Sequence, residues 1–147
     1  MKLTRRKALS LGGSVGSVAV SGCTGLLSDN SYLTLTLLNF DSTEHEMNID
    51  IYRTEADKYR EAIILRERYD LSTPPEDDAA YQHIEEEILE SDKYIVRVNL
   101  ETAPATRATY PFYPALKGDD ERTDTLFIEI RTELDGTEPY IEFKQNY

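Results

Sequence analysis

Apolar and polar residues alternate with a two-residue period in several short segments of this chain. In residues 32–40, for example, Leu33, Leu35 and Leu37 fall on one side of an extended backbone. This period is typical of β-strands that bury one face, because successive side chains of a strand point to opposite sides of the sheet. The pattern recurs in residues 46–53, 61–69, 83–89, 94–100, 107–113, 125–132 and 140–143. We therefore expect a mainly β fold.

Seven to eight short strands, with turn residues roughly every 8 to 12 positions, predict an antiparallel β-sandwich of immunoglobulin-like architecture. Residues 46–53 are expected to fold back on residues 32–40 as a hairpin. Residues 84–100 resemble the hairpin that recurs in extracellular sandwich modules. The chain has no Trp, and its single Cys precedes the predicted strands, so the Cys and Trp of antibody-type domains are absent and only the architecture carries over.

Residues 77–89 fit two descriptions. Two Ala and two Ile at helical spacing fit a helix of about three turns. Residues 83–89 also alternate like a strand, and a polar turn follows them. We favour at most one short helical turn near residues 77–83, followed by a strand.

The charge balance limits what the chain binds. The 147 residues include 16 Lys and Arg and 28 Asp and Glu. The first 22 residues hold four of the basic side chains and none of the acidic ones, so the remainder carries 12 basic and 28 acidic side chains, a net charge of −16. Such a surface repels phosphate backbones, and nucleic acid is not an expected partner. The length fits one small globular domain.

The first 23 residues follow the three-part pattern of an export signal. A basic start at residues 1–7 precedes a mildly apolar run at residues 8–20. This run is too short for a membrane-spanning helix, which needs roughly 18 or more residues. The pair Arg5-Arg6, with Lys7 after it, resembles a twin-arginine signal, which directs the export of folded proteins.

Residues 20–23, with the sequence VSGC, resemble a lipobox, in which the Cys receives a lipid and the preceding residues are removed. A single Cys in an exported chain has no partner for an internal disulfide, and its position favours lipid attachment. The expected organisation is a twin-arginine lipoprotein signal peptide at residues 1–22, a lipidated Cys23 with a short flexible tether at residues 23–31, and a β-sandwich domain at residues 32–147.

The leader and the composition together resemble the small twin-arginine-exported lipoproteins of halophilic archaea. Only four Lys follow residue 23, and acidic residues occur in runs. Clustered carboxylates repel one another at low ionic strength, whereas near molar salt the Debye length shrinks to roughly 3 Å and the repulsion largely disappears. The resemblance implies a protein on the extracytoplasmic face of the cell membrane, anchored by a lipid on Cys23.

Few residues have the spacing or the motifs expected of a catalytic or metal-binding site. His45 and His83 have no other His or Cys at metal-ligand spacing, and both are expected to be solvated side chains beside carboxylates. The predicted domain contains no nucleophile motif and no Gly-rich phosphate loop. The acidic groups at residues 76–78 and 119–121 lack the spacing of a Ca²⁺-binding loop. We expect no enzyme activity, no cofactor and no metal site.

The segment of residues 110–114, with the sequence YPFYP, has the most unusual local composition. Its two Pro residues withhold backbone donors, which suits an edge strand and blocks pairing with other chains. In the favoured interpretation Tyr110 or Phe112 packs in the core. In the other, Tyr110, Phe112 and Tyr113 form an exposed candidate patch for a partner.

These observations predict a membrane-anchored lipoprotein that acts as a non-enzymatic interaction or accessory module of the cell envelope. Its partners would be the membrane and an unidentified envelope protein. The alternative is a lipoprotein that binds a small ligand or Ca²⁺, which needs a concave pocket lined by Tyr and carboxylate side chains. An enzyme would need His45 or His83 within hydrogen-bond reach of a carboxylate and a nucleophile inside a cleft.

Overall fold

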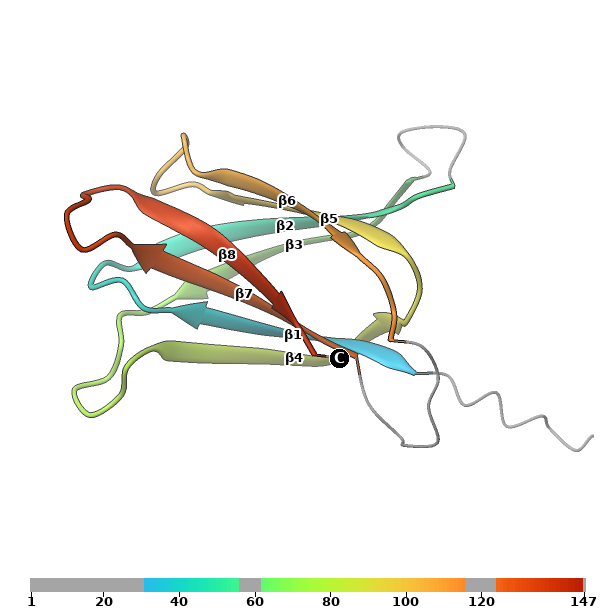
Figure 1. The fold of residues 1–147 in the computed structure, drawn as a ribbon, viewed down its shortest axis with the longest axis horizontal. Helices are drawn as coiled ribbons and strands as arrows, with labels where there is room; N and C mark the ends of the chain where they lie inside the picture. Colours follow the sequence, from blue (N-terminus) through green and yellow to red (C-terminus); the bar gives the residue numbers. More distant parts are fainter. Residues whose placement is uncertain (1–30, 56–61, 116–123, 147) are drawn as a thin grey trace, which may run out of the picture.

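The protein folds into two β-sheets that pack face to face (Figure 1). This computed structural model describes residues 31–55, 62–115 and 124–146. Its strands are β1 (Tyr32–Asn39), β2 (His45–Arg53), β3 (Ile63–Leu71), β4 (Tyr81–Glu90), β5 (Tyr94–Leu100), β6 (Arg107–Phe112), β7 (Asp124–Thr132) and β8 (Pro139–Gln145). The predicted β-sandwich is confirmed, with eight strands.

Sheet A has the strand order β4-β1-β7-β8, and sheet B has the order β3-β2-β5-β6. Neighbouring strands are antiparallel except β1 and β7, which run parallel. In immunoglobulin constant-type domains the first strand pairs with the second, whereas here it pairs with the fourth and the seventh. The sandwich architecture is therefore as expected, and the connections between its strands are different.

Two predicted hairpins are wrong. The strands expected to pair in residues 32–40 and 46–53 lie in different sheets, because β1 is central in sheet A and β2 is central in sheet B. Residues 84–100 likewise cross from β4 in sheet A to β5 in sheet B. Alternation shows that a strand has one buried face, but it does not determine which strand is its neighbour. The crossing connections bury both apolar faces by placing them opposite each other.

The ambiguous segment is a turn followed by a strand. The amide of Asp78 donates a hydrogen bond of 3.0 Å to the carbonyl oxygen of Pro75, and β4 begins three residues later. No helical turn forms at residues 77–80. The β1–β4 pairing contains an irregularity between Leu33 and Leu35, and Glu87 in β4 has a positive φ of 52°.

The core lies between the sheets and is built mainly by the four central strands. Its fully buried residues alternate along each of these strands, as the sequence period predicts. The core residues are Leu33, Leu35, Leu37, Met47, Ile49, Ile51, Leu71, Tyr94, Val96, Val98, Leu100, Phe112, Leu126, Ile128 and Ile130.

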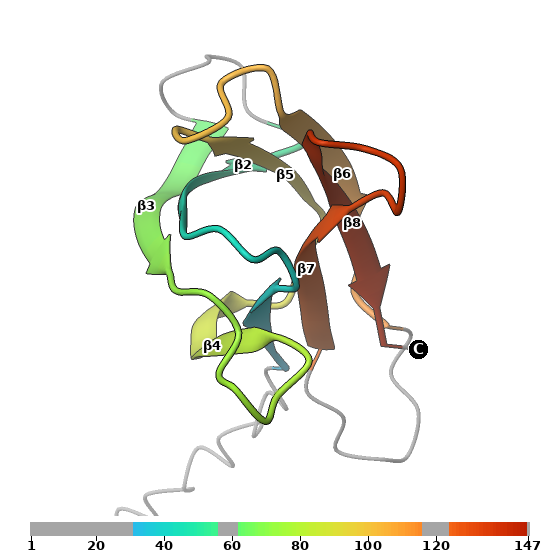
Figure 2. The ribbon, with the colours of Figure 1, turned by 90° about the vertical axis from the view of Figure 1, so that its left-hand side faces the viewer.

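The sandwich has two ends. Ser31 lies at the end that we call proximal, where its carbonyl oxygen accepts a hydrogen bond of 2.7 Å from the amide of Ser91. The connections at residues 40–44, 72–80, 101–106 and 133–138 gather at the opposite end, which we call distal (Figure 2). The described part of the chain contains no helix with the length and hydropathy that crossing a membrane requires.

Candidate functional site

His45 is buried at the distal end, with only 4% of its surface exposed. The expectation of a solvated side chain is therefore wrong. His45 is the first residue of β2 and has the same phase as Met47 and Ile49, so the alternation of the strand turns its ring toward the core. Extending the apolar period by one step toward the N-terminus would have predicted this burial.

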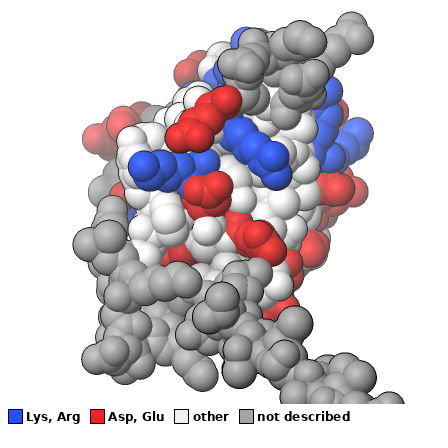
Figure 3. All heavy atoms as spheres, turned by 90° about the vertical axis from the view of Figure 1, so that its right-hand side faces the viewer, with Lys and Arg blue, Asp and Glu red and all other residues white. Residues whose placement is uncertain are grey.

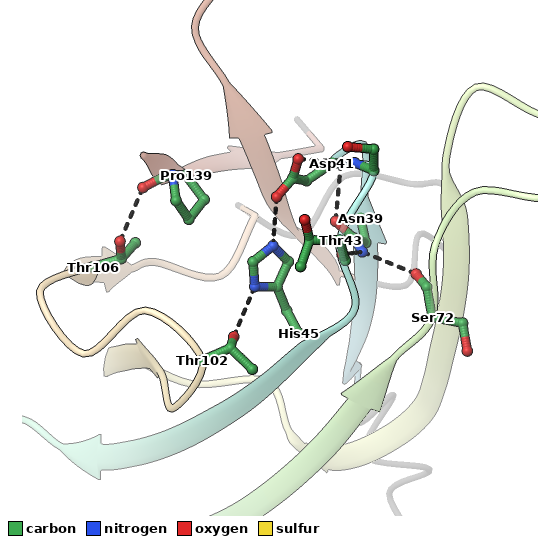
Figure 4. A network of polar contacts seen from close by, with 9 residues as sticks. Asn39, Asp41, Thr43, His45, Ser72, Thr102, Thr106 and Pro139 are labelled. Atoms are coloured by element: carbon green, nitrogen blue, oxygen red, sulfur yellow. Dashed lines mark hydrogen bonds and ion pairs between the residues drawn. The ribbon is translucent and has the colours of Figure 1, made fainter. Parts of the chain in front are cut away.

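Both ring nitrogens of His45 have polar partners (Figure 4). Nε2 lies 2.7 Å from Oδ2 of Asp41, and Nδ1 lies 2.8 Å from Oγ1 of Thr102. A neutral ring with its proton on Nε2 satisfies both contacts, donating to the carboxylate and accepting from the hydroxyl. The ring thereby joins the β1–β2 connection to the β5–β6 connection.

Asp41 is stabilised in its ionised form. Burial alone raises the pKa of this carboxyl. Hydrogen bonds outweigh burial and lower the pKa below its ordinary value of 3.8, and the donors are His45, Thr132 and the Ser42 amide. A carboxylate that accepts several hydrogen bonds favours its charged form.

Asn39 completes this network. Its side chain is fully buried, and it follows the inward-facing Leu residues of β1 in the same phase. Its Nδ2 donates hydrogen bonds of 2.8 Å to the carbonyl oxygen of Thr43 and 2.9 Å to that of Ser72, and its Oδ1 accepts one of 3.0 Å from the amide of Asp41. Asn39 and His45 are thus the polar residues at the distal ends of the inward-facing apolar rows of β1 and β2.

The order carboxylate, imidazole, hydroxyl in Asp41, His45 and Thr102 is the order found in base-activated nucleophiles. His45 therefore lies within hydrogen-bond reach of both a carboxylate and a hydroxyl, as an enzyme of this kind would need. The ring of His45 is only 4% exposed, however, which gives a substrate almost no access to it. We therefore interpret the network as the closure of the distal end of the core.

A second buried polar residue closes the proximal end. Asp124, the first residue of β7, is 3% exposed and lies in phase with the core residues of that strand. Its carboxylate accepts hydrogen bonds from the hydroxyl of Ser91 and, at 2.9 Å, from the amide of Ala115. The β4–β5 connection and the residues after β6 are tied together in this way.

The predicted aromatic patch does not form one exposed surface. Phe112 is fully buried and its ring stacks on Tyr94, with centroids 6.3 Å apart. Tyr110 stacks on Phe143 of β8 at 5.0 Å, and only Tyr113 is widely exposed, at 57%. β6 is an edge strand of sheet B, so the favoured interpretation of an edge strand with a core aromatic is confirmed.

His83 lies at the other open edge of the sandwich, where β3 faces β4. Its Nε2 is 2.7 Å from Oε1 of Glu85, and its ring centroid is 5.3 Å from that of Tyr69. Burial, together with the charges of Glu85 and Glu67, raises the pKa of Tyr69 to about 12. His83 is 35% exposed, so the expectation of a solvated His beside a carboxylate holds for this residue.

The outer face of sheet A combines exposed apolar side chains with a charge-balanced cluster on β7 and β8. One row across it contains Ile84, Thr36, Phe127 and Lys144, and the next contains Gln82, Leu38, Glu129 and Glu142. Ile84 is 49% exposed and Tyr140, on the same face, is 40% exposed.

The charged residues of this face neutralise one another. Glu129 is 4% exposed and pairs with Arg131 at 2.6 Å and with Lys144 at 2.9 Å. Arg131 also pairs with Glu142 at 3.0 Å, and its guanidinium lies 4.2 Å from the ring centroid of Phe40. Two acids and two bases form this cluster, so the part of the face built by β7 and β8 is close to neutral, whereas the edge strand β4 carries the exposed acids Glu86 and Glu90.

The remaining predicted sites are placed as follows. Within residues 31–55, 62–115 and 124–146, no group of three or more His, Cys, Asp and Glu residues is arranged to hold a metal ion. The acidic group at residues 76–78 is exposed on a distal connection. The acidic group at residues 119–121, the twin arginines Arg5 and Arg6, and Cys23 lie outside the described residues.

Comparison of the sequence with protein-family models and with curated protein sequences gives no match.

Proposed function

We propose that this protein is a lipid-anchored β-sandwich on the extracytoplasmic face of the cell membrane, where it serves as a non-catalytic interaction module of the envelope. One observation carries the proposal: a VSGC motif ends at Cys23, only eight residues before the sandwich begins. A chain of eight residues spans at most about 28 Å, so a lipid on Cys23 holds the domain close to the bilayer.

The most distinctive polar network supports a non-catalytic module. The side chains of Asn39, Asp41 and His45 satisfy one another and the neighbouring backbone at the end of the core. Such a network stabilises the connections between strands. The imidazole ring of His45 is enclosed within it.

We assign contacts with an envelope protein to the outer face of sheet A. Ile84 and Tyr140 expose apolar surface there, and the four charges of the Glu129 cluster neutralise one another on the β7–β8 side of this face. Protein interfaces combine an apolar centre with few unpaired charges.

Fractionation of wild type and the Cys23→Ala variant, made in a halophilic archaeal host, tests the anchor. We expect wild type in the membrane fraction, with a lipid mass on a chain that begins at residue 23. Cys23→Ala should be found outside the membrane fraction. Soluble wild-type protein that keeps its leader would overturn the proposal.

Photo-crosslinking in the same cells tests the interaction face. A photoreactive amino acid at Ile84 should give a protein adduct, whereas the same residue at Thr109, on the outer face of sheet B, should give none. Equal adducts at both positions, or none at Ile84, would remove the assignment of this face while leaving the anchor intact.

A further inference from the structure

Acidic residues are concentrated at the distal end of the sandwich. Its four connections, residues 40–44, 72–80, 101–106 and 133–138, contain nine Asp and Glu residues and no Lys or Arg. Eight of the nine are exposed. The connections are held together by the hydrogen bonds from Asn39 to Ser72, from Thr102 to His45 and from Thr106 to Pro139. The distal end is therefore a fixed negative pole.

The proximal end has two exposed cations near Ser31, the first described residue, together with the exposed acids Glu55, Glu90 and Asp92. Arg53, the last residue of β2, is paired with Tyr94 of β5, and Lys93 directly precedes Tyr94. Both cations are exposed, and neither forms an ion pair with another described residue. Lys93 is two residues from Ser91, whose amide bonds to Ser31. Figure 3 shows this end, with basic groups between acidic ones.

We propose that the sandwich stands on the membrane with its proximal end against anionic lipid headgroups, where Arg53 and Lys93 contact phosphate, and with its acidic distal end pointing outward. This inference rests on the proposed lipid anchor. Eight residues separate Cys23 from β1 and can span at most about 28 Å, so the proximal end stays within reach of the headgroup layer. Charged hydrogen bonds from Arg and Lys to phosphate are shorter and stronger than neutral ones.

The two poles act in the same direction. Among the described residues, the proximal end has the exposed cations Arg53 and Lys93 and three exposed acids, whereas the distal connections have nine carboxylates and no cation. An anionic surface therefore repels the distal end far more strongly, which favours the orientation with the proximal end toward the membrane. The repulsion is long-ranged and is screened within about 10 Å at 0.1 M salt, whereas direct contacts to phosphate persist at higher salt. The preferred orientation should therefore weaken, but not vanish, in molar NaCl.

The test uses the full lipidated chain in vesicles. A fluorophore is attached to an introduced thiol at Thr54→Cys on the proximal end or at Ser42→Cys on the distal end, because both positions are exposed and uncharged. Vesicles of phosphatidylglycerol or of phosphatidylcholine carry a headgroup-linked quencher. The tether alone brings residue 54 closer to the bilayer than residue 42 in both kinds of vesicle. The orientation is therefore tested by the difference between the two lipids and by the effect of the variants on that difference.

We expect the ratio of quenching at residue 54 to that at residue 42 to be at least twofold higher on phosphatidylglycerol. Arg53→Gln with Lys93→Gln should remove this difference. Arg107→Gln, which removes one charge from a side chain far from Ser31, should change the difference between the two lipids less than Arg53→Gln alone does. Equal ratios in the two lipids, or no effect of the double variant, would overturn the orientation while the anchor stands. Wild type that does not float with vesicles and has no lipid mass would overturn both.

Discussion

The imidazole of His45 lies 2.7 Å from the carboxylate of Asp41, and the pair closes one end of a core built otherwise from apolar side chains. Asp41 lies in the connection between β1 and β2, His45 is the first residue of β2, and this connection crosses from one sheet to the other. The contact therefore fixes the crossing that brings the two apolar faces together. Removal of one partner leaves a poorly solvated polar group without its bond, which costs more than the bond itself contributes.

The His45→Ala variant should lower the free energy of unfolding by about 2–3 kcal/mol, because it creates a cavity and removes the donor to Asp41. Urea denaturation at neutral pH and high salt measures this change. His83→Ala is the matched control, since its single ion pair to Glu85 is half-exposed and contributes less than about 1 kcal/mol. Equal losses for the two variants would contradict a special role for His45.

Glu129 should make the protein sensitive to acid. Burial raises the pKa of its carboxyl, but hydrogen bonds and charges from Lys144 and Arg131 outweigh burial and lower it below 4.5. Its stabilising contribution is therefore present above pH 4.5 and is lost as the pH falls through the pKa of the folded state.

Glu129→Gln should reduce stability at pH 7 by about 1–2 kcal/mol and flatten its decline in acid. Thermal unfolding between pH 3 and pH 7 measures both effects. Glu142→Gln, on the neighbouring strand, should leave the acid profile close to that of wild type. A profile unchanged in Glu129→Gln would show that other carboxylates cause the acid sensitivity.

The alternation of apolar residues predicted the location and the buried face of nearly every strand. It also contained information on the distal network, because Asn39 and His45 continue the apolar phases of β1 and β2. The pairing of strands could not be predicted in this way. A buried face on residues 32–40 is equally compatible with a hairpin partner and with a partner from a distant part of the chain.

The site was harder to predict than the fold. The sequence favours a core position for Tyr110 or Phe112 and leaves a surface patch as the alternative, and the complete burial of Phe112 decides between them. The charge-balanced cluster on the outer face of sheet A depends on side chains from two strands in register, including Glu129 opposite Glu142. Such a surface cannot be found before the strand order is known.

Tyr69 should ionise only at very alkaline pH. Burial first, and then the charges of Glu85 and Glu67, raise its pKa to about 12, whereas its ordinary value is 10.0. A raised pKa gives a contribution to stability that is complete below pH 10 and is lost as the pH rises toward 12.

Spectrophotometric titration should show fewer Tyr residues ionising near pH 10 in wild type than after denaturation, since burial also raises the pKa of Tyr94. Tyr69→Phe should reduce that difference by one Tyr and make unfolding less sensitive to alkali, with little change at pH 7. Tyr113→Phe, which alters an exposed ring, serves as the control. An undiminished difference in Tyr69→Phe would assign the late ionisation to other residues.

Pro111 should protect the β6 edge from pairing with other chains. It lies inside an edge strand, opposite Ile95, and has no amide to donate. Pro111→Val restores a donor and raises β-propensity, so we expect faster aggregation with little loss of stability. Light scattering during incubation below the unfolding temperature measures the aggregation rate. Pro114→Val, which lies after the strand, should aggregate at the wild-type rate, and the prediction fails if the two variants behave alike.

The strongest environmental dependence should be on salt. A net charge of −16 over residues 23–147, with nine carboxylates on the distal connections, produces repulsion that salt screens. The urea midpoint should therefore rise between 0.1 M and 2 M NaCl. Because salt also strengthens burial of apolar groups, a charge variant is needed to separate the two causes.

The triple variant Glu76→Gln, Asp77→Asn, Asp78→Asn removes three exposed charges without touching the core. It should be more stable than wild type at 0.1 M NaCl by roughly 1 kcal/mol, because each removed charge relieves repulsion from its neighbours at short range. The two proteins should converge in 2 M NaCl, where the Debye length is shorter than about 3 Å. A constant difference at all salt concentrations would mean that the variant acts through the local conformation of residues 72–80. Equal stability of wild type and the triple variant at every salt concentration would mean that salt acts on apolar burial.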